Sequence, residues 1–167
     1  KGTMLAYLQG LSLGLAYVAP IGVQNLFVIN AGLSQPRAAA YRTALIVIFF
    51  DVTLALAGFF GIGALIEHSE LIRKGVLLAG SLVVMYMGLR LMLSREVAGP
   101  AINVNIPLMK TIGMACVVTW FNPQAIIDVS LLLGSFRVAL PPEESGLFLW
   151  GVVCESCLWF LSLTTIS

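Results

Sequence analysis

Hydrophobic residues form five long runs along the chain, separated by short polar stretches. The runs cover about Leu5–Asn30, Ala38–Leu65, Leu71–Leu93, Leu108–Phe136 and Gly146–Ser167. Each is long enough to cross a hydrocarbon core of about 30 Å as a helix that rises about 1.5 Å per residue. Backbone groups that face lipid must be hydrogen-bonded within their own segment, so the pattern predicts an all-α bundle of membrane-spanning helices.

The composition supports this prediction. Hydrophobic residues make up 59% of the 167 residues and charged residues only 10%, whereas a soluble domain carries roughly a quarter charged residues. So few charges cannot cover a surface that faces water, and the outside of the bundle is therefore expected to face lipid. The net charge of +1 and the lack of a basic patch give no indication of nucleic-acid binding.

Two of the runs carry a proline and polar residues near their middle. Proline removes a helix hydrogen bond and frees carbonyl groups, which lipid cannot satisfy but a polar cavity can. We therefore expect broken helices in the first and fourth runs. The residues at these two breaks are Pro20, Gly22, Gln24, Asn25, Asn122 and Pro123.

The spacing of the polar residues indicates an internal repeat. The matching pairs are Pro20 with Pro123, Asn25 with Asp128, and Asp51 with Glu155. The first two pairs lie 103 residues apart and the third 104. Equivalent elements are three runs apart, and an odd number reverses the orientation of the second half. Inverted repeats with matching broken helices are typical of secondary transporters with a substrate site at the membrane midplane.

This spacing predicts two inverted three-helix repeats. The first covers residues 1–96, a loop follows at residues 97–107, and the second repeat covers residues 108–167. The second repeat then has two runs where the first has three. We therefore expect that a sixth helix is missing from this chain.

Three acidic residues lie inside the predicted spans. Asp51 is midway along its run, where a charge costs about 2.5–3.5 kcal/mol on insertion scales, so it must face the bundle interior, a cavity or a partner. A carboxylate held there can exchange protons near neutral pH. Asp128 follows Pro123 by five residues, or about one and a half helical turns, so it should lie near the second break and could pair with an amine or guanidinium.

Structural roles compete with each of these functional ones. Asp51 could simply tie helices together by hydrogen bonds, and Asp128 could cap groups freed by Pro123. The depth of Glu155 depends on where its helix begins, so helix packing and a role in transport are equally compatible with the sequence. Trp120 borders the second break and could line a cavity.

No pattern in the sequence indicates an enzyme, a cofactor or a metal site. There is no H-E-x-x-H motif, no P-loop and no cysteine with a neighbouring histidine. Cys154 and Cys157 are one helical turn apart, which suggests a redox pair, but two small residues that pack between helices are the simpler interpretation.

Together, these motifs resemble the lysine/arginine exporter family. The resemblance rests on Pro20-Ile-Gly-Val-Gln-Asn25, on Asp51 in mid-helix, and on Thr119-Trp-Phe-Asn-Pro-Gln-Ala-Ile-Ile-Asp128 followed by Leu133-Gly-Ser135. It covers nearly the whole chain. Homoserine and other neutral amino acid exporters of the same superfamily are similar in the first run, but they generally lack an acidic residue corresponding to Asp128.

The resemblance implies six helices and a carrier in the bacterial inner membrane that uses the proton gradient. It also implies that Asp51 and Asp128 meet the substrate or protons. Glu155 stands where the family leads us to expect a small residue, so no role can be carried over to it.

We therefore predict a secondary exporter of L-lysine or L-arginine that works by alternating access. Asp51 and Asp128 would carry the charge, while Gln24, Asn25 and Asn122 would bind substrate or support the bends. The expected partners are a basic amino acid, protons and the lipid bilayer, with a homo-oligomer left open. A neutral amino acid exporter, a channel, a transmembrane thiol-redox carrier and a purely structural subunit are the alternatives.

Overall fold

The computed structural model describes residues 2–20, 22–61 and 106–167, together with the single positions 70, 71, 74, 78 and 85. Most of the predicted third run, Leu71–Leu93, and of the predicted loop at residues 97–107 lies outside the described residues. The described part therefore bears on the first, second, fourth and fifth runs.

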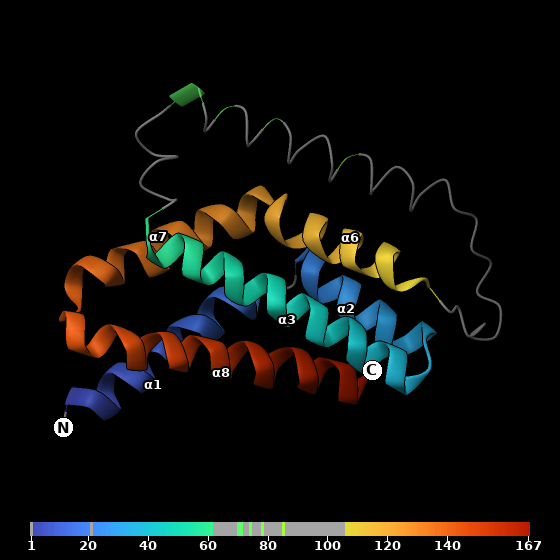
Figure 1. Ribbon diagram of the computed structural model, residues 1–167, viewed down its shortest axis with the longest axis horizontal. Coiled ribbons are helices and arrows are strands. Elements are labelled where there is room, and N and C mark those ends of the chain that lie inside the picture. Colours follow the sequence, from blue (N-terminus) through green and yellow to red (C-terminus); the bar gives the residue numbers. More distant parts are fainter. Residues whose placement is uncertain are drawn as a thin grey trace.

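Every regular element in the described part of the chain is a helix (Figure 1). The helices are α1 (Gly2–Val18), α2 (Val23–Ser34), α3 (Arg37–Phe59), α6 (Leu108–Trp120), α7 (Pro123–Ala139) and α8 (Pro142–Ile166). The prediction of an all-α fold is confirmed.

The helices of the described part account for up to four membrane spans by length and composition. Helices α3 and α8 are each long and apolar enough to cross a membrane alone. The other four form two bent pairs, α1 with α2 at 81° and α6 with α7 at 54°, and each pair qualifies as one broken span. Both predicted breaks are therefore present, in the first and fourth runs.

Proline and glycine set several helix ends. The fifth span begins at Pro142 and not near the predicted Gly146, because proline is well placed in the first turn, where its missing N–H has no partner to lose. Helix α3 ends at Phe59, before the predicted Leu65. Gly61 follows with a φ of +107°, a conformation that glycine adopts without the steric cost other residues meet.

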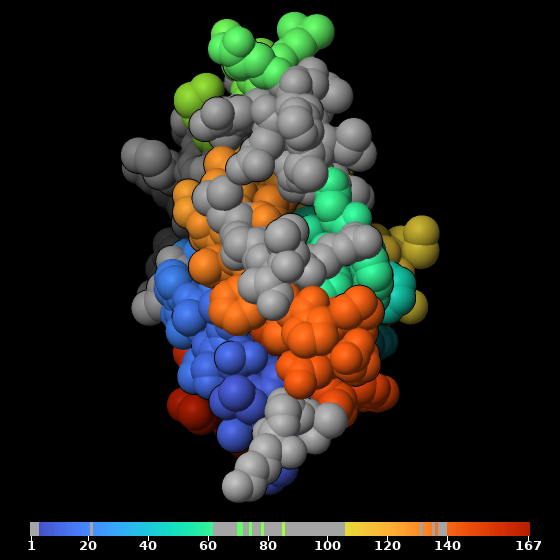
Figure 2. Space-filling model, turned by 90° about the vertical axis from the view of Figure 1, so that its left-hand side faces the viewer, coloured from blue at the N-terminus to red at the C-terminus, as the bar shows by residue number. Residues whose placement is uncertain are grey.

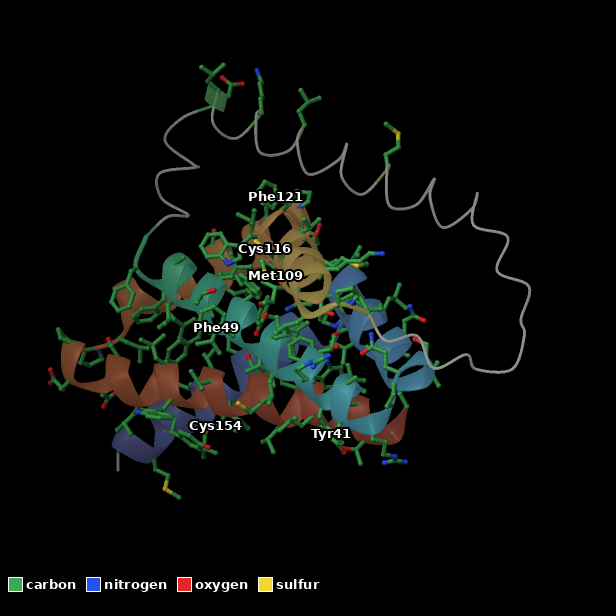
Figure 3. All side chains as sticks on the ribbon, turned by 45° about the vertical axis from the view of Figure 1, so that its right-hand side comes forward. Tyr41, Phe49, Met109, Cys116, Phe121 and Cys154 are labelled. Carbon is green, nitrogen blue, oxygen red and sulfur yellow. The ribbon has the colours of Figure 1, made fainter. Side chains whose placement is uncertain are left out.

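Helix α3 lies at the centre of the bundle and contacts α2, α6, α7 and α8, while α1 packs along α8 (Figure 1). A stack of aromatic rings joins three of these helices. Phe148 of α8 lies between Phe59 of α3 and Phe136 of α7, with ring centroids 5.7 Å and 5.4 Å apart. Large apolar side chains also cover the outside. Phe49 and Met109, both labelled in Figure 3, are 62% and 78% exposed, which suits contact with lipid.

Helices α1 and α8 meet backbone to backbone at glycine residues. A Cβ atom on Gly10 would lie 2.0 Å from the carbonyl oxygen of Phe148, and one on Gly151 would lie 2.3 Å from the carbonyl oxygen of Tyr7. No side chain fits at these distances, so glycine is what permits the contact. Figure 2 shows the end of the molecule where α1 (blue) lies against the corner between α7 and α8 (orange).

We predict that Gly151→Ala destabilises the full-length protein, because the new methyl group would overlap the α1 backbone. Overpacking of this kind costs about 1–3 kcal/mol. Unfolding in mixed micelles with increasing SDS, followed by circular dichroism, measures the change.

Gly146→Ala in the same helix is the matched control, since a Cβ atom there meets nothing within 4 Å. Alanine favours helix over glycine, so this variant should be as stable as the wild type or slightly more so. Equal losses of stability in the two variants would contradict the close α1–α8 contact.

Candidate functional site

Asp51 is fully buried near the middle of α3, and side chains from three other helices donate hydrogen bonds to it. Tyr17 of α1 and Gln24 of α2 donate to Oδ1, the latter at 3.2 Å. Ser156 of α8 donates to Oδ2 at 2.6 Å. An ionised carboxylate can only accept hydrogen bonds, so donors on both oxygens match its needs. The carboxylate joins α1, α2, α3 and α8 at one point.

Asn25 bridges the break between α1 and α2. Its Nδ2 donates to the carbonyl oxygens of Val18 at 2.8 Å and of Pro20 at 3.0 Å. Its Oδ1 accepts a hydrogen bond from the indole N–H of Trp159 on α8 at 3.1 Å. The last carbonyl groups of a helix lack partners within the helix, and lipid offers none. Asn25 supplies the missing hydrogen-bond donor to both carbonyl groups and holds the break against α8.

The second break is built differently. Pro123 is the first residue of α7, so it begins a helix instead of interrupting one. Asn122 caps this helix, because its Oδ1 accepts a hydrogen bond from the backbone N–H of Gln124 at 3.2 Å. The side chain of Gln124 in turn donates to Oδ1 of Asp128 at 2.8 Å.

A cavity of about 110 Å³ lies between the two breaks. Six of the predicted site residues line it, namely Pro20, Gly22, Gln24, Asn25, Asn122 and Asp128. The two breaks, about 100 residues apart in the sequence, therefore form one site.

Asp51 lies directly behind the cavity wall. Tyr17 and Gln24 both line the cavity and donate hydrogen bonds to Asp51. Asp128 lines the cavity itself. The two carboxylates predicted to carry the chemistry are thus associated with the same cavity, one at its wall and one a single hydrogen bond behind it.

Three other predicted site residues lie outside the lining. Pro123 is followed and preceded by lining residues but does not line the cavity itself. Trp120 donates its indole N–H to Oγ1 of Thr53 at 3.2 Å and so joins α6 to α3. Glu155 is 3% exposed and lies near the middle of α8, because this helix begins at Pro142. Its depth, left open by the sequence, is therefore that of a buried interior residue.

Four residues whose side chains make hydrogen bonds at the site were not predicted, namely Tyr17, Gln124, Ser156 and Trp159. Tyrosine and tryptophan count as apolar in a hydropathy pattern, so their hydrogen bonds leave no signal there. Ser156 looks like a small residue that packs between helices. Gln124 follows the predicted Asn122-Pro123 pair directly, and Tyr17 precedes Pro20 by three residues, so closeness to a break could have identified both.

The site is acidic. Among the basic side chains that the structure describes, Arg37, Arg42, Lys74 and Lys110 are all exposed, and none lines the cavity. The cavity therefore presents Asp128, with Asp51 behind it, and no described residue supplies a counter-charge. Such a site can accept a cationic group and exclude a second anion.

A metal site or a thiol pair in the described part of the chain would require a cluster of suitable side chains. No group of three His, Cys, Asp or Glu side chains there could hold a metal ion. Cys116, Cys154 and Cys157 are free thiols, and none lines the cavity. Cys116 lies on α6 and Cys154 on α8, well separated in Figure 3. This arrangement does not favour a thiol-redox carrier built around the two breaks.

Comparison with known proteins places the chain among transporters. The family model of the LysE type translocator matches residues 15–167. The arginine exporter protein ArgO of Serratia proteamaculans is 31% identical over 98% of this chain and 82% of its own length. ArgO of Pectobacterium atrosepticum is 30% identical over 96% of this chain and 80% of its own length, and ArgO of Escherichia coli K12 is 32% identical over 96% and 77%. No solved structure matches the chain.

We predict that Asn25→Leu destabilises the protein strongly. The variant leaves the carbonyl groups of Val18 and Pro20 and the indole N–H of Trp159 without their partner. Each buried polar group left alone costs about 1–3 kcal/mol, so the total loss should exceed about 2 kcal/mol. SDS unfolding followed by circular dichroism measures it.

Asn30→Leu provides the control, because Asn30 is exposed on the same helix α2. A change of about 0.5 kcal/mol or less is expected there. If Asn25→Leu were as mild as Asn30→Leu, the hydrogen bonds of Asn25 would not be what holds the break.

Proposed function

The chain belongs to the family of LysE type translocators, and from this premise we propose that it exports basic L-amino acids, arginine or lysine, across the bacterial inner membrane. As a member of this family it is a multi-pass membrane transport protein and not an enzyme. The observation that carries the proposal is the acidic cavity between two broken helices, with Asp128 at its wall and Asp51 behind it.

The cavity suits both ends of a basic amino acid. The guanidinium or ammonium of the side chain would pair with Asp128, which faces the cavity. Helices α2 and α7 both begin at the cavity, where Gly22 and Asn122 are their N-terminal cap residues. A helix N-terminus carries a partial positive charge and unpaired N–H groups, which attract a carboxylate. Broken helices present substrate carboxylates with such ends in other transporters.

The size of the cavity supports a moving site. A volume of about 110 Å³ is well below the roughly 300 Å³ at which ligand pockets usually begin. Binding a basic amino acid therefore requires the helices around the breaks to move apart. This requirement fits alternating access, in which the bundle opens to one side of the membrane at a time.

The two halves of the predicted inverted repeat supply the moving parts. The bent pair of α1 and α2 would correspond to α6 and α7, and α3 would correspond to α8. Rocking of one half against the other would open the cavity to each side in turn. Proton exchange on the buried Asp51 carboxylate would help to release the cationic substrate and link export to the proton gradient.

The first test is a counterflow panel of labelled amino acids with the full-length protein in proteoliposomes. We expect saturable exchange of arginine and lysine. Asp128→Asn should lower the rate about 100-fold, as expected when the charge that pairs with the substrate cation and contributes about 3 kcal/mol is removed. Asp51→Asn should lower the rate by a similar factor, because it removes the charge behind the cavity wall and the acceptor of three hydrogen bonds.

Glu143→Gln, at the exposed start of α8, is the control and should transport like the wild type. Exchange of neutral amino acids alone, with Asp128→Asn fully active, would favour a neutral amino acid exporter. Full activity with basic substrates in both aspartate variants would overturn the proposed site.

A further inference from the structure

We infer that Glu155 is a proton-binding site of this protein, occupied by a proton in the packing seen here and emptied when α1 moves away from α8. The role in transport rests on the proposed export function. The site itself rests on the burial and the surroundings of the Glu155 side chain.

Glu155 is buried and has no hydrogen-bond partner among the residues that the structure describes. It is 3% exposed, and neither of its carboxylate oxygens has a hydrogen-bond partner in the described part of the chain. The side chain packs on Gly14 of α1, where a Cβ atom would lie 2.9 Å from Oε2. An ionised carboxylate without donors is far more costly to bury than a neutral carboxylic acid. The surroundings therefore favour the protonated form.

The contrast with Asp51 assigns the proton to Glu155. The two acids interact electrostatically, and a nearby negative charge disfavours the ionised form of a second acid. Asp51 receives hydrogen bonds from Tyr17, Gln24 and Ser156, which suit an ionised group. Glu155 receives none from the described residues.

No helix packed against α8 offers a described counter-charge for Glu155. Tyr17 on α1, Asp51 on α3 and Cys157 on α8 itself interact electrostatically with Glu155, and none of the three can carry a positive charge. The basic residues of α3, Arg37 and Arg42, are exposed. Helix α2 also packs on α8 and contains no titratable residue. A proton is therefore the ligand that this arrangement can hold.

The α1–α8 contact controls access to this proton. The contacts at Gly10 and Gly151 bring the backbones of α1 and α8 together. Gly14 of α1 packs directly on the side chain of Glu155. Ionisation needs water or a donor, so it requires α1 to separate from α8. The same movement would withdraw Tyr17 of α1 from Asp51. Loss of the proton from Glu155 and exposure of Asp51 are thus coupled through one helix.

Infrared spectroscopy of the full-length protein in lipid bilayers tests the proton site directly. At neutral pH the wild type should show the C=O stretching band of a buried protonated carboxyl group. Glu155→Gln should abolish this band, while Asp51→Asn and the exposed control Glu143→Gln should retain it. A band that persists in Glu155→Gln, or one that disappears in Asp51→Asn alone, would overturn the inference.

A transport assay tests whether the Glu155 proton site takes part in export. A pH gradient should stimulate arginine export by the wild type in proteoliposomes, and Glu155→Gln should lose this stimulation. Glu155→Asp keeps a carboxyl group and should retain it in part, which guards against a variant that merely folds poorly.

The two hypotheses fail in different ways. If the wild type moves no basic amino acid, the proposed export function is wrong, while the infrared band still decides the protonation of Glu155. If the wild type exports arginine and Glu155→Gln keeps the full response to pH, the role of Glu155 is wrong and the export function stands.

Discussion

A buried carboxylate in a lipid-embedded bundle must find its hydrogen-bond donors inside the protein, and this constraint organises the described structure. Asp51 receives donors from α1, α2 and α8 while it belongs to α3. Four helices must therefore meet at one depth for the charge to be tolerated at all. The cavity forms beside this point because two of the donors, Tyr17 and Gln24, also line it. The packing of the bundle and the chemistry of the site thus depend on the same contacts.

The same constraint explains why the two breaks differ in detail. At the first break the chain leaves carbonyl groups without partners, and Asn25 donates to two of them. At the second break, Asn122 and Pro123 begin a new helix, so the groups without helical partners are backbone N–H groups. One of them, the N–H of Gln124, donates a hydrogen bond to the side chain of Asn122. Lipid can satisfy neither kind of group. Both solutions leave helix N-termini at one cavity, which gives a polar site in the middle of an apolar bundle.

Sequence was sufficient for the features that depend on local composition. The helical class, the two single spans, the two bent pairs and both breaks follow from apolar run lengths and from Pro20 and Pro123, and six predicted residues line the cavity. Contacts that depend on packing could not be predicted. The pairing of Tyr17 and Ser156 with Asp51, and of Trp159 with Asn25, requires knowing which helix faces which. Helix α8 begins at Pro142, four residues before the predicted Gly146, and Glu155 therefore lies deeper in the helix than the sequence indicated.

Under the predicted inverted repeat, α1 and α6 are equivalent, as are α3 and α8, so the α1–α8 contact corresponds to the contact between α6 and α3. The structure packs these two pairs unequally, because α1 lies along α8 far more extensively than α6 lies along α3. The matching acids are unequal as well, since Asp51 has three donors and Glu155 has none among the described residues. A repeat transporter changes sides when one repeat rocks against the other. Both contacts join one predicted repeat to the other, so rocking would alter them both, and the environment of each acid would change in the step that moves the substrate.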